Sequence, residues 1–520
     1  MATDKLGHFP LQDVTIDFSP EARIDKYRAS KPSATSLHPA VIKDAGGEIH
    51  AVAKVTFMPS AEGRQKLLQC AKINRMLQDH PNIINVYGIK EQDEWLALLL
   101  EQAVCSLRDI INPVTPEMVK MQETILAKIS MKDILRQVCS AMTYVHSKTD
   151  DVNNNISHRD IKPENVLICL QKRDGSFIPK LTDFDSSKQL DVDERVHITT
   201  NVFTEEYKDP AIDDMKLDDQ LVIVISYLFA DIYALGVSAF ELLGNGMYLF
   251  QGKNKRETAI KINSNDRSNL LESDIDGLAK IMIYTMTQSD QQLQITATEV
   301  ENHIYFHDDN SHIRALNAVN EALMDLDDSK ESKSIKDIFN KSFYMVFQVE
   351  WKTLDFVAPK TLEFSKYSST LESMLRYSRN MMQHTEQHKA ALADHYGVLE
   401  ISSTVVLQQM QKSTQCGLLH FYWFGQQHLG LDFGIPDNCL LAYEEWMEEE
   451  KLKIVGGVEL LFERLCLKPD EATTPKDAGI GLAETFDQSF QDMRQILDKT
   501  EREFKVMIVT IHSQIQFHVI

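Results

Sequence analysis

Cysteine is scarce in this chain, and its seven cysteines form no CxxC pair. Their scatter excludes a disulfide framework and a zinc site built from paired cysteines, and it is typical of reduced thiols in a cytosolic protein. Basic residues are also in the minority, because 54 Lys and Arg stand against 77 Asp and Glu and give a net charge of −23. That balance opposes general binding to phosphate backbones, so any nucleic-acid site must be local.

Long apolar runs are absent as well. The most apolar stretch, residues 221–230, is 10 residues long and stops at Asp231, which is too short to cross a bilayer and favours a buried helix. The first residues contain no apolar core of a signal peptide. We therefore expect a cytoplasmic protein with no membrane segment.

The length and the overall composition indicate a globular protein of several parts. A chain of 520 residues is too long for one core and suggests three or four domains. Hydrophobic residues make up 43% and charged residues 25%, which is ordinary for a globular protein. This composition excludes the fibrous and disordered classes.

One polar stretch carries the residue types of a phosphotransfer site. Residues 158–165 read His-Arg-Asp-Ile-Lys-Pro-Glu-Asn, and Asp183-Phe184-Asp185 follows downstream. Phosphoryl transfer needs a carboxylate to take the proton of the accepting hydroxyl and oxygen ligands to hold Mg²⁺ over the phosphates. Asp160, Asn165 and Asp183 offer those groups. A charged turn between two strands is the alternative interpretation.

The run 158–165 resembles the catalytic loop of the protein kinases. The resemblance implies that Asp160 and Lys162 act on the accepting hydroxyl. It also implies that Asn165 and Asp183 hold Mg²⁺ beside a bound ATP or ADP.

Upstream of this loop, the sequence predicts a sheet. Polar and apolar residues alternate over 22–58 with turn residues at 44–47, which indicates a meander with a hairpin, and the apolar run 96–100 indicates a strand buried on both faces. The kinase resemblance implies that Lys54 reaches the α- and β-phosphates and that Glu101 lies at the hinge beside adenine. Taken alone, a lysine that ends a strand is usually a solvated edge residue.

Three departures from the kinase pattern concern the phosphates. The stretch 30–36, where the family has a glycine-rich loop, contains no glycine, so side chains hold this backbone away from phosphate. Cys70 stands on the predicted helix 62–77 where a glutamate usually pairs with Lys54, and Asp185 replaces a glycine. These changes predict a weakened phosphate clamp and leave open whether phosphotransfer is retained.

Two further departures occur together on the substrate side. The kinases end their activation segment in Ala-Pro-Glu, whereas this chain has Asp209-Pro210-Ala211, and Gln294 stands where an arginine would pair with that glutamate. Losing both partners avoids leaving one buried charge alone, which costs about 3–5 kcal/mol. We infer a kinase-like domain that still folds while its substrate side is relaxed.

A second polar cluster occupies residues 367–384. One face of the helix predicted there is apolar and comprises Leu371, Met374, Leu375, Ser378 and Met382. Arg379 and Asn380 lie off this stripe, between Tyr367 and His384. By itself this pattern is that of an ordinary packed helix.

The context of this helix gives it a second interpretation. A kinase-like domain followed by Tyr, then Arg-Asn, then His resembles the kinase/endoribonuclease family, which includes the inositol-requiring enzyme of the unfolded-protein response and the 2-5A-dependent ribonuclease L. The resemblance implies that Tyr367 acts near the base that activates a ribose 2′-hydroxyl and that His384 is the acid. Arg379 with Asn380 would then bind the phosphate. Eight Lys and Arg against seven Asp and Glu in residues 341–420 leave this segment near neutral, so RNA is tolerated there.

We therefore predict an α+β chain in which a bilobed protein-kinase-like fold precedes a mainly α-helical kinase-extension nuclease (KEN) domain. The expected parts are an N-lobe at 22–103, a C-lobe at 104–310 and a KEN-type ribonuclease domain at 311–430. Residues 431–520 carry no motif, and a partner-binding or dimer-supporting extension is the default expectation.

The leading hypothesis is a metal-independent endoribonuclease that cleaves RNA as a back-to-back homodimer. ATP or ADP with Mg²⁺ in the kinase-like domain would promote this pairing, with phosphotransfer weak or lost, and a separate sensor protein would carry the signal. The alternatives are an active serine/threonine kinase with a regulatory C-terminal domain, or a silent scaffold. The RNA target, the cleavage specificity and the activating signal are not encoded in any recognisable pattern.

Overall fold

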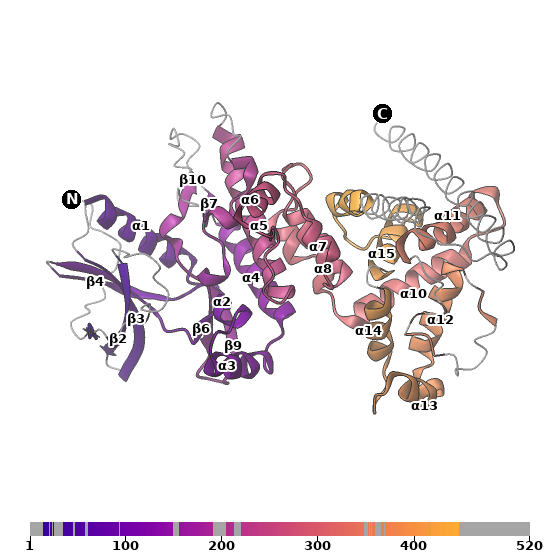
Figure 1. Ribbon diagram of the computed structural model, residues 1–520, viewed down its shortest axis with the longest axis horizontal. Coiled ribbons are helices and arrows are strands. Elements are labelled where there is room, and N and C mark those ends of the chain that lie inside the picture. Colours follow the sequence, from indigo (N-terminus) through magenta and orange to yellow (C-terminus); the bar gives the residue numbers. More distant parts are fainter. Residues whose placement is uncertain are drawn as a thin grey trace, which may run out of the picture. The chain divides into compact units, whose positions relative to one another are not determined.

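The computed structural model describes most residues between 14 and 446 (Figure 1). Within this range the undescribed residues are 20, 23, 25–34, 45–46, 58–60, 93, 149–154, 191–203, 213–219, 348–351, 353, 355, 359–365, 369 and 415–416. By its internal contacts the chain divides into two units, Met1–Lys451 and Leu452–Ile520. The second unit lies wholly outside the described residues, as does most of the predicted glycine-free stretch 30–36.

The N-terminal part contains a five-stranded antiparallel sheet with the order β1-β2-β3-β5-β4 (Figure 1). Its strands are β1 (Val14–Ile16), β2 (Thr35–Asp44), β3 (Gly47–Phe57), β4 (Val86–Gln92) and β5 (Trp95–Glu101). β2 and β3 form a hairpin that closes with the pair Asp44↔Gly47, at the predicted turn. Gly47 has a φ of +131°, a conformation that L side chains rarely adopt, which accounts for glycine there.

Burial in this sheet follows the sequence pattern. Alternate residues of β3 are buried and comprise Ala51, Ala53 and Val55. Lys54 therefore lies on the opposite face. Residues 96–99 of β5 are also buried, and they divide alternately between two separate hydrophobic clusters. The prediction of a strand buried on both faces is confirmed.

The next part is mainly helical and holds two small sheets. One sheet consists of β6 (Cys105–Ser106), β8 (Val166–Leu170) and β9 (Phe177–Leu181), and the other pairs β7 (Asn155–Ser157) with β10 (Lys188–Leu190). The short 3₁₀ turns are η1 (Pro163–Asn165), η2 (Phe184–Ser186), η4 (Glu205–Tyr207), η5 (Pro210–Ile212) and η6 (Ile304–Phe306). The helices up to this point are α1 (Ala61–Leu77), α2 (Leu107–Ile111), α3 (Pro116–Leu126), α4 (Met131–Ser147), α5 (Gln220–Leu243), α6 (Lys255–Asn263), α7 (Ser268–Glu272), α8 (Gly277–Met286) and α9 (Ala297–Glu301).

The central helices are held by apolar packing. The helical spacing in 131–147 is confirmed by buried side chains that comprise Ile134, Leu135, Val138, Met142 and Val145. The apolar run 221–230 belongs to α5, which continues through Asp231 to Leu243, and residues 232–242 of this helix are buried. Among the described residues, no helix is both long and apolar enough to span a bilayer.

The C-terminal region of the first unit is helical. Its helices are α10 (Asp309–Asp325), α11 (Lys330–Phe347), α12 (Leu371–Gln383), α13 (Thr385–Tyr396), α14 (Ser403–Thr414) and α15 (Gly417–His428). α12 packs against α10, α11 and α14, and residues 435–446 bury apolar side chains in the same core as α15. The mixed helix-and-strand fold with a helical C-terminal region is confirmed, while the four predicted domain bounds stay predictions.

Candidate functional site

Asp231 anchors the loop that contains the predicted kinase residues. Its buried carboxylate accepts hydrogen bonds from the backbone N–H groups of His158 (2.8 Å) and Arg159 (2.7 Å) and from the Ser157 hydroxyl (2.9 Å). Nε2 of His146 lies 3.0 Å from the same carboxylate. Burial alone would raise the pKa of Asp231, but these neighbours outweigh it and lower that pKa. The anchored loop holds Arg159 in a left-handed conformation with a φ of +68°.

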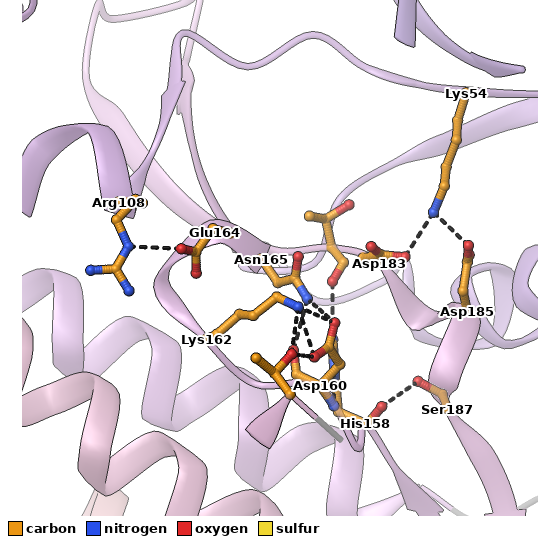
Figure 2. Close-up of polar contacts among 12 residues, drawn as sticks. Lys54, Arg108, His158, Asp160, Lys162, Glu164, Asn165, Asp183, Asp185 and Ser187 are labelled. Atoms are coloured by element: carbon orange, nitrogen blue, oxygen red, sulfur yellow. Dashed lines mark hydrogen bonds and ion pairs between the residues drawn. The ribbon is translucent and has the colours of Figure 1, made fainter. Parts of the chain in front are cut away.

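Asp160 lies within a cluster of donors (Figure 2). Lys162 Nζ is 2.9 and 2.7 Å from its two carboxylate oxygens, and the Thr204 hydroxyl donates to Oδ1 at 2.7 Å. Asn165 Nδ2 donates to the backbone oxygen and to Oδ2 of Asp160, each at 2.8 Å. The structure thus brings the predicted residues Asp160, Lys162 and Asn165 together. A carboxylate fixed in this way is suited to accept the proton of a hydroxyl.

Asp183 follows β9 in a left-handed conformation with a φ of +66°. The next residue, Phe184, is buried, and its ring centroid lies 4.6 Å from that of His158. Lys54 Nζ lies 2.7 Å from Asp183 Oδ1 and 2.6 Å from Asp185 Oδ2 (Figure 2). The predicted nucleotide residues Lys54 and Asp183 are therefore in direct contact.

The charges of this cluster support one another. Burial alone would lower the pKa of Lys54, but the carboxylates of Asp183 and Asp185 outweigh burial and raise that pKa. Burial would likewise raise the pKa of Asp183, and the ammonium of Lys54 outweighs it and lowers that pKa. Lys54 and Asp183 are consequently both charged at neutral pH.

The same residues fit a magnesium ion. Asn165 uses its amide nitrogen on Asp160, so its carbonyl oxygen is the group suited to a cation, and Asp183 adds carboxylate oxygens. Among the described residues, no group of three or more His, Cys, Asp or Glu is arranged to hold a metal without further ligands. Mg²⁺ commonly takes one or two protein oxygens and completes its shell with phosphates and water.

Helix α1 presents Cys70 at the position predicted for a glutamate. This side chain is 2% exposed, and burial, followed by the negative charge of Asp185, raises the pKa of its thiol. Asn74, one turn later, donates to the backbone oxygen of Cys70 at 2.9 Å. The ion pairs of Lys54 thus run to the segment 183–185 rather than to residue 70.

Glu101, predicted at the adenine hinge, ends β5. Its Oε2 accepts from Asn85 Nδ2 and from Lys180 Nζ, each at 2.8 Å. The carboxylate is therefore engaged within the protein. A contact with adenine would have to come from the backbone of the hinge.

The second predicted site lies at the end of α12. All five residues of its predicted apolar face are buried: Leu371, Met374, Leu375, Ser378 and Met382. Asn380 Nδ2 donates to the Tyr367 hydroxyl at 2.8 Å, and Arg379 Nη1 lies 3.5 Å from Asn380 Oδ1. Arg379 is half-buried, and its Nε has no hydrogen-bond partner among the described residues. Tyr367 and Asn380 are thus in direct contact, and Arg379 lies beside Asn380.

His384 occupies the junction between α12 and α13. Its backbone N–H donates to Asn380 O at 2.9 Å, which fixes it one turn beyond Asn380, and its side chain is exposed. His388 follows on α13, and burial together with the neighbouring His384 lowers the pKa of His388. The exposed imidazole of His384 is accessible to a phosphate in solvent.

Comparison with known proteins decides the family. The family model described as the protein kinase domain matches residues 40–306, about half of the chain. The chain belongs to the protein kinase family. Membership implies the general use of ATP and Mg²⁺, in agreement with the ammonium of Lys54 and the oxygen ligands of Asn165 and Asp183.

The most informative relatives combine two activities in their names. A serine/threonine-protein kinase/endoribonuclease, ire-1, of Caenorhabditis elegans is 26% identical over 45% of this chain and 23% of its own length. The IRE1 enzyme of Oryza sativa subsp. japonica is 25% identical over 44% of this chain and 24% of its own length. Calcium-dependent protein kinase 5 of Plasmodium berghei is 28% identical over 46% of this chain and 37% of its own length. The matches therefore span well under half of each relative.

The kinase domain also contains contacts near the catalytic loop that the sequence did not predict. Arg108 on α2 places Nε 2.8 Å from Glu164 of the catalytic loop (Figure 2). The Arg108 guanidinium also contacts Glu241 and Tyr207. The Tyr207 hydroxyl donates to Glu241 Oε1 at 2.5 Å. Thr204 was missed as well. No local spacing signals such contacts, since Arg108 and Glu241 are separated by 133 positions.

The two departures on the substrate side have different surroundings. Gln294 is buried and donates to the backbone oxygens of Phe229 (3.0 Å) and Met286 (2.6 Å), so it needs no carboxylate partner. Asp209 is fully buried, and its Oδ1 accepts from the backbone N–H of Ala211 at 2.9 Å. Its Oδ2 has no hydrogen-bond partner among the described residues. Burial raises the pKa of Asp209 to about 7.

Asp209 is therefore expected to make the stability of the protein depend on pH. Because its pKa is higher in the folded chain than the ordinary 3.8, the folded state binds the extra proton, and the free energy of unfolding falls as pH rises from about 4 to about 7. Asp209→Asn keeps the acceptor for Ala211 and removes the titration. The variant is expected to match the wild type below about pH 4 and to exceed it by a few kcal/mol above about pH 7. Urea unfolding at a series of pH values from about 4 to about 7 checks this expectation. The same pH dependence of the free energy of unfolding in both proteins would contradict it.

Proposed function

We propose that this protein is a metal-independent endoribonuclease whose kinase domain binds ATP or ADP with Mg²⁺ and thereby favours a back-to-back homodimer. The observation that carries the proposal is the 2.8 Å hydrogen bond from Asn380 to Tyr367, with Arg379 beside it and the exposed His384 one turn away. The names of the Caenorhabditis elegans and Oryza sativa relatives, which join a kinase to an endoribonuclease, support it.

The chemistry assigns one task to each side chain. A base removes the proton of the ribose 2′-hydroxyl, whose oxygen attacks the adjacent phosphorus, and an acid protonates the departing 5′-oxygen. Tyr367, held in place by its hydrogen bond with Asn380, acts near the base that removes the proton of the 2′-hydroxyl. His384 gives its proton to the leaving 5′-oxygen. Arg379 stabilises the charge on the phosphate oxygens. The products are a 2′,3′-cyclic phosphate and a 5′-hydroxyl.

The kinase domain would act as a switch. Nucleotide and Mg²⁺ at Lys54, Asn165 and Asp183 shift the population toward a conformation that pairs with a second copy. Phosphotransfer is not needed for this role, so the neutral Cys70 is compatible with it. RNA is then the substrate, and a separate sensor protein would supply the signal in the cytoplasm.

The test uses the purified full chain and a structured RNA. Cleavage is expected to continue in EDTA at protein concentrations that allow pairing. In Mg²⁺, a non-hydrolysed ATP analogue is expected to raise both the cleavage rate and the dimer fraction seen by sedimentation. An RNA left intact under both conditions would overturn the proposal.

An active serine/threonine kinase is the second candidate, and one observation favours it. Thr204 and Lys162 both contact the carboxylate of Asp160, which orients the predicted base for a hydroxyl substrate. Transfer of labelled phosphate from ATP to the chain itself or to a Ser- or Thr-containing peptide, abolished by Asp160→Ala, would support this function. No transfer above that of Asp160→Ala would exclude it.

A further inference from the structure

We propose that Asp185 is the positioning residue of Lys54 and takes over the task of a carboxylate on helix α1, where the neutral Cys70 stands. The inference rests on the nucleotide-binding part of the proposed function. It concerns how the lysine is aimed at phosphate, not whether phosphate is transferred.

The geometry places two carboxylates on one lysine. Lys54 projects from β3, and its Nζ lies 2.6 Å from Asp185 and 2.7 Å from Asp183 (Figure 2). Both carboxylates belong to one short segment around η2, which packs against helix α1. Phe184 between them is buried against His158, so the segment has a fixed position.

The two carboxylates have different tasks once a nucleotide arrives. Mg²⁺ over the phosphates would take oxygens of Asp183, which then no longer hold Lys54 alone. Asp185 keeps the ammonium in place while Asp183 turns to the metal. The alternative interpretation is an ordinary surface ion pair between Asp185 and Lys54. Such a pair would contribute little to stability, since the Asp185 side chain is 42% exposed.

The neutral residue at position 70 is part of the same arrangement. Cys70 lies buried beside Asp185, and a glutamate there would put a third carboxylate near a single lysine. In this chain the negative charge that pairs with Lys54 therefore stands at position 185 instead of position 70. A consequence is that no side chain of helix α1 is needed to pair with Lys54.

Moving the carboxylate from position 185 to position 70 tests the proposal. Binding of a fluorescent ADP with Mg²⁺ is titrated for the full-length wild type, Asp185→Asn, Cys70→Glu, and the double variants Cys70→Glu/Asp185→Asn and Cys70→Gln/Asp185→Asn. Asp185→Asn is expected to weaken binding at least about 10-fold, and Cys70→Glu in the Asp185→Asn background to restore most of it. Glutamine at position 70 has the size of glutamate without its charge, so it is expected to restore nothing. Asp79→Asn, on an exposed turn, is the control and is expected to bind as the wild type does.

The outcomes separate this inference from the proposed function. Wild-type binding with an unaffected Asp185→Asn, or equal rescue by glutamine and glutamate, overturns the positioning role alone. A wild type that binds no nucleotide overturns the proposed switch as well. If the variants at position 70 unfold in a melting scan, Asp185→Glu decides, because it keeps the charge and is expected to bind far better than Asp185→Asn.

Discussion

Replacing His384 by alanine is expected to lower the rate of RNA cleavage by about 100-fold or more, because the 5′-oxygen would leave without a proton donor. The side chain is exposed at the junction of α12 and α13, so the variant is expected to fold and melt as the wild type does. Initial rates on one structured RNA in EDTA measure the effect.

The neighbouring Gln383 supplies a matched control. It is also exposed, stands one position earlier, and has no task in the mechanism, so Gln383→Ala is expected to cleave RNA at the wild-type rate. Equal rates for His384→Ala and the wild type would remove His384 from the mechanism. Equal losses for both variants would point to a damaged helix end instead.

Asp231→Asn is expected to have the largest effect on the kinase domain. Each oxygen of Asp231 accepts one backbone N–H, from His158 or from Arg159. In asparagine one of these oxygens becomes an NH₂ group, which cannot accept, so one backbone N–H loses its acceptor. Asp231 is buried, so bulk solvent does not replace the lost charge. We expect a loss of about 3–5 kcal/mol in the free energy of unfolding, together with loss of nucleotide binding.

Urea unfolding followed by circular dichroism measures the loss in the free energy of unfolding, and a nucleotide titration measures the loss of binding. Asp274→Asn is the matched control, because it makes the same chemical change at an exposed position of the helical lobe. Stability within about 0.5 kcal/mol of the wild type for Asp231→Asn would contradict the role of Asp231 as the anchor of the loop.

Local patterns in the sequence predicted much of this fold. The turn residues at 44–47 predicted the β2–β3 hairpin, and the uninterrupted run 96–100 predicted a strand buried on both sides. The helical spacing in 371–382 predicted the buried face of α12 and placed Arg379 and Asn380 off that face. These features depend on neighbours within a turn or a strand, where spacing carries the information.

Contacts between distant segments could not be predicted in the same way. No local pattern indicated that Asp231 accepts hydrogen bonds from a loop more than 70 positions away. The pairing of Lys54 with Asp185 joins residues 131 positions apart, and the sequence indicated only that a usual partner was missing. Thr204 gave no signal, because a single threonine carries no periodicity and no motif.

The chemistry of the cleaved RNA ends tests the central claim most directly. If Tyr367 and His384 act through the ribose 2′-hydroxyl, RNA cut by the purified chain in EDTA is expected to carry 2′,3′-cyclic phosphate and 5′-hydroxyl ends. Mass spectrometry of the fragments distinguishes these ends. Fragments with 5′-phosphate and 3′-hydroxyl ends would contradict the account, because they arise when water rather than the 2′-hydroxyl attacks the phosphorus.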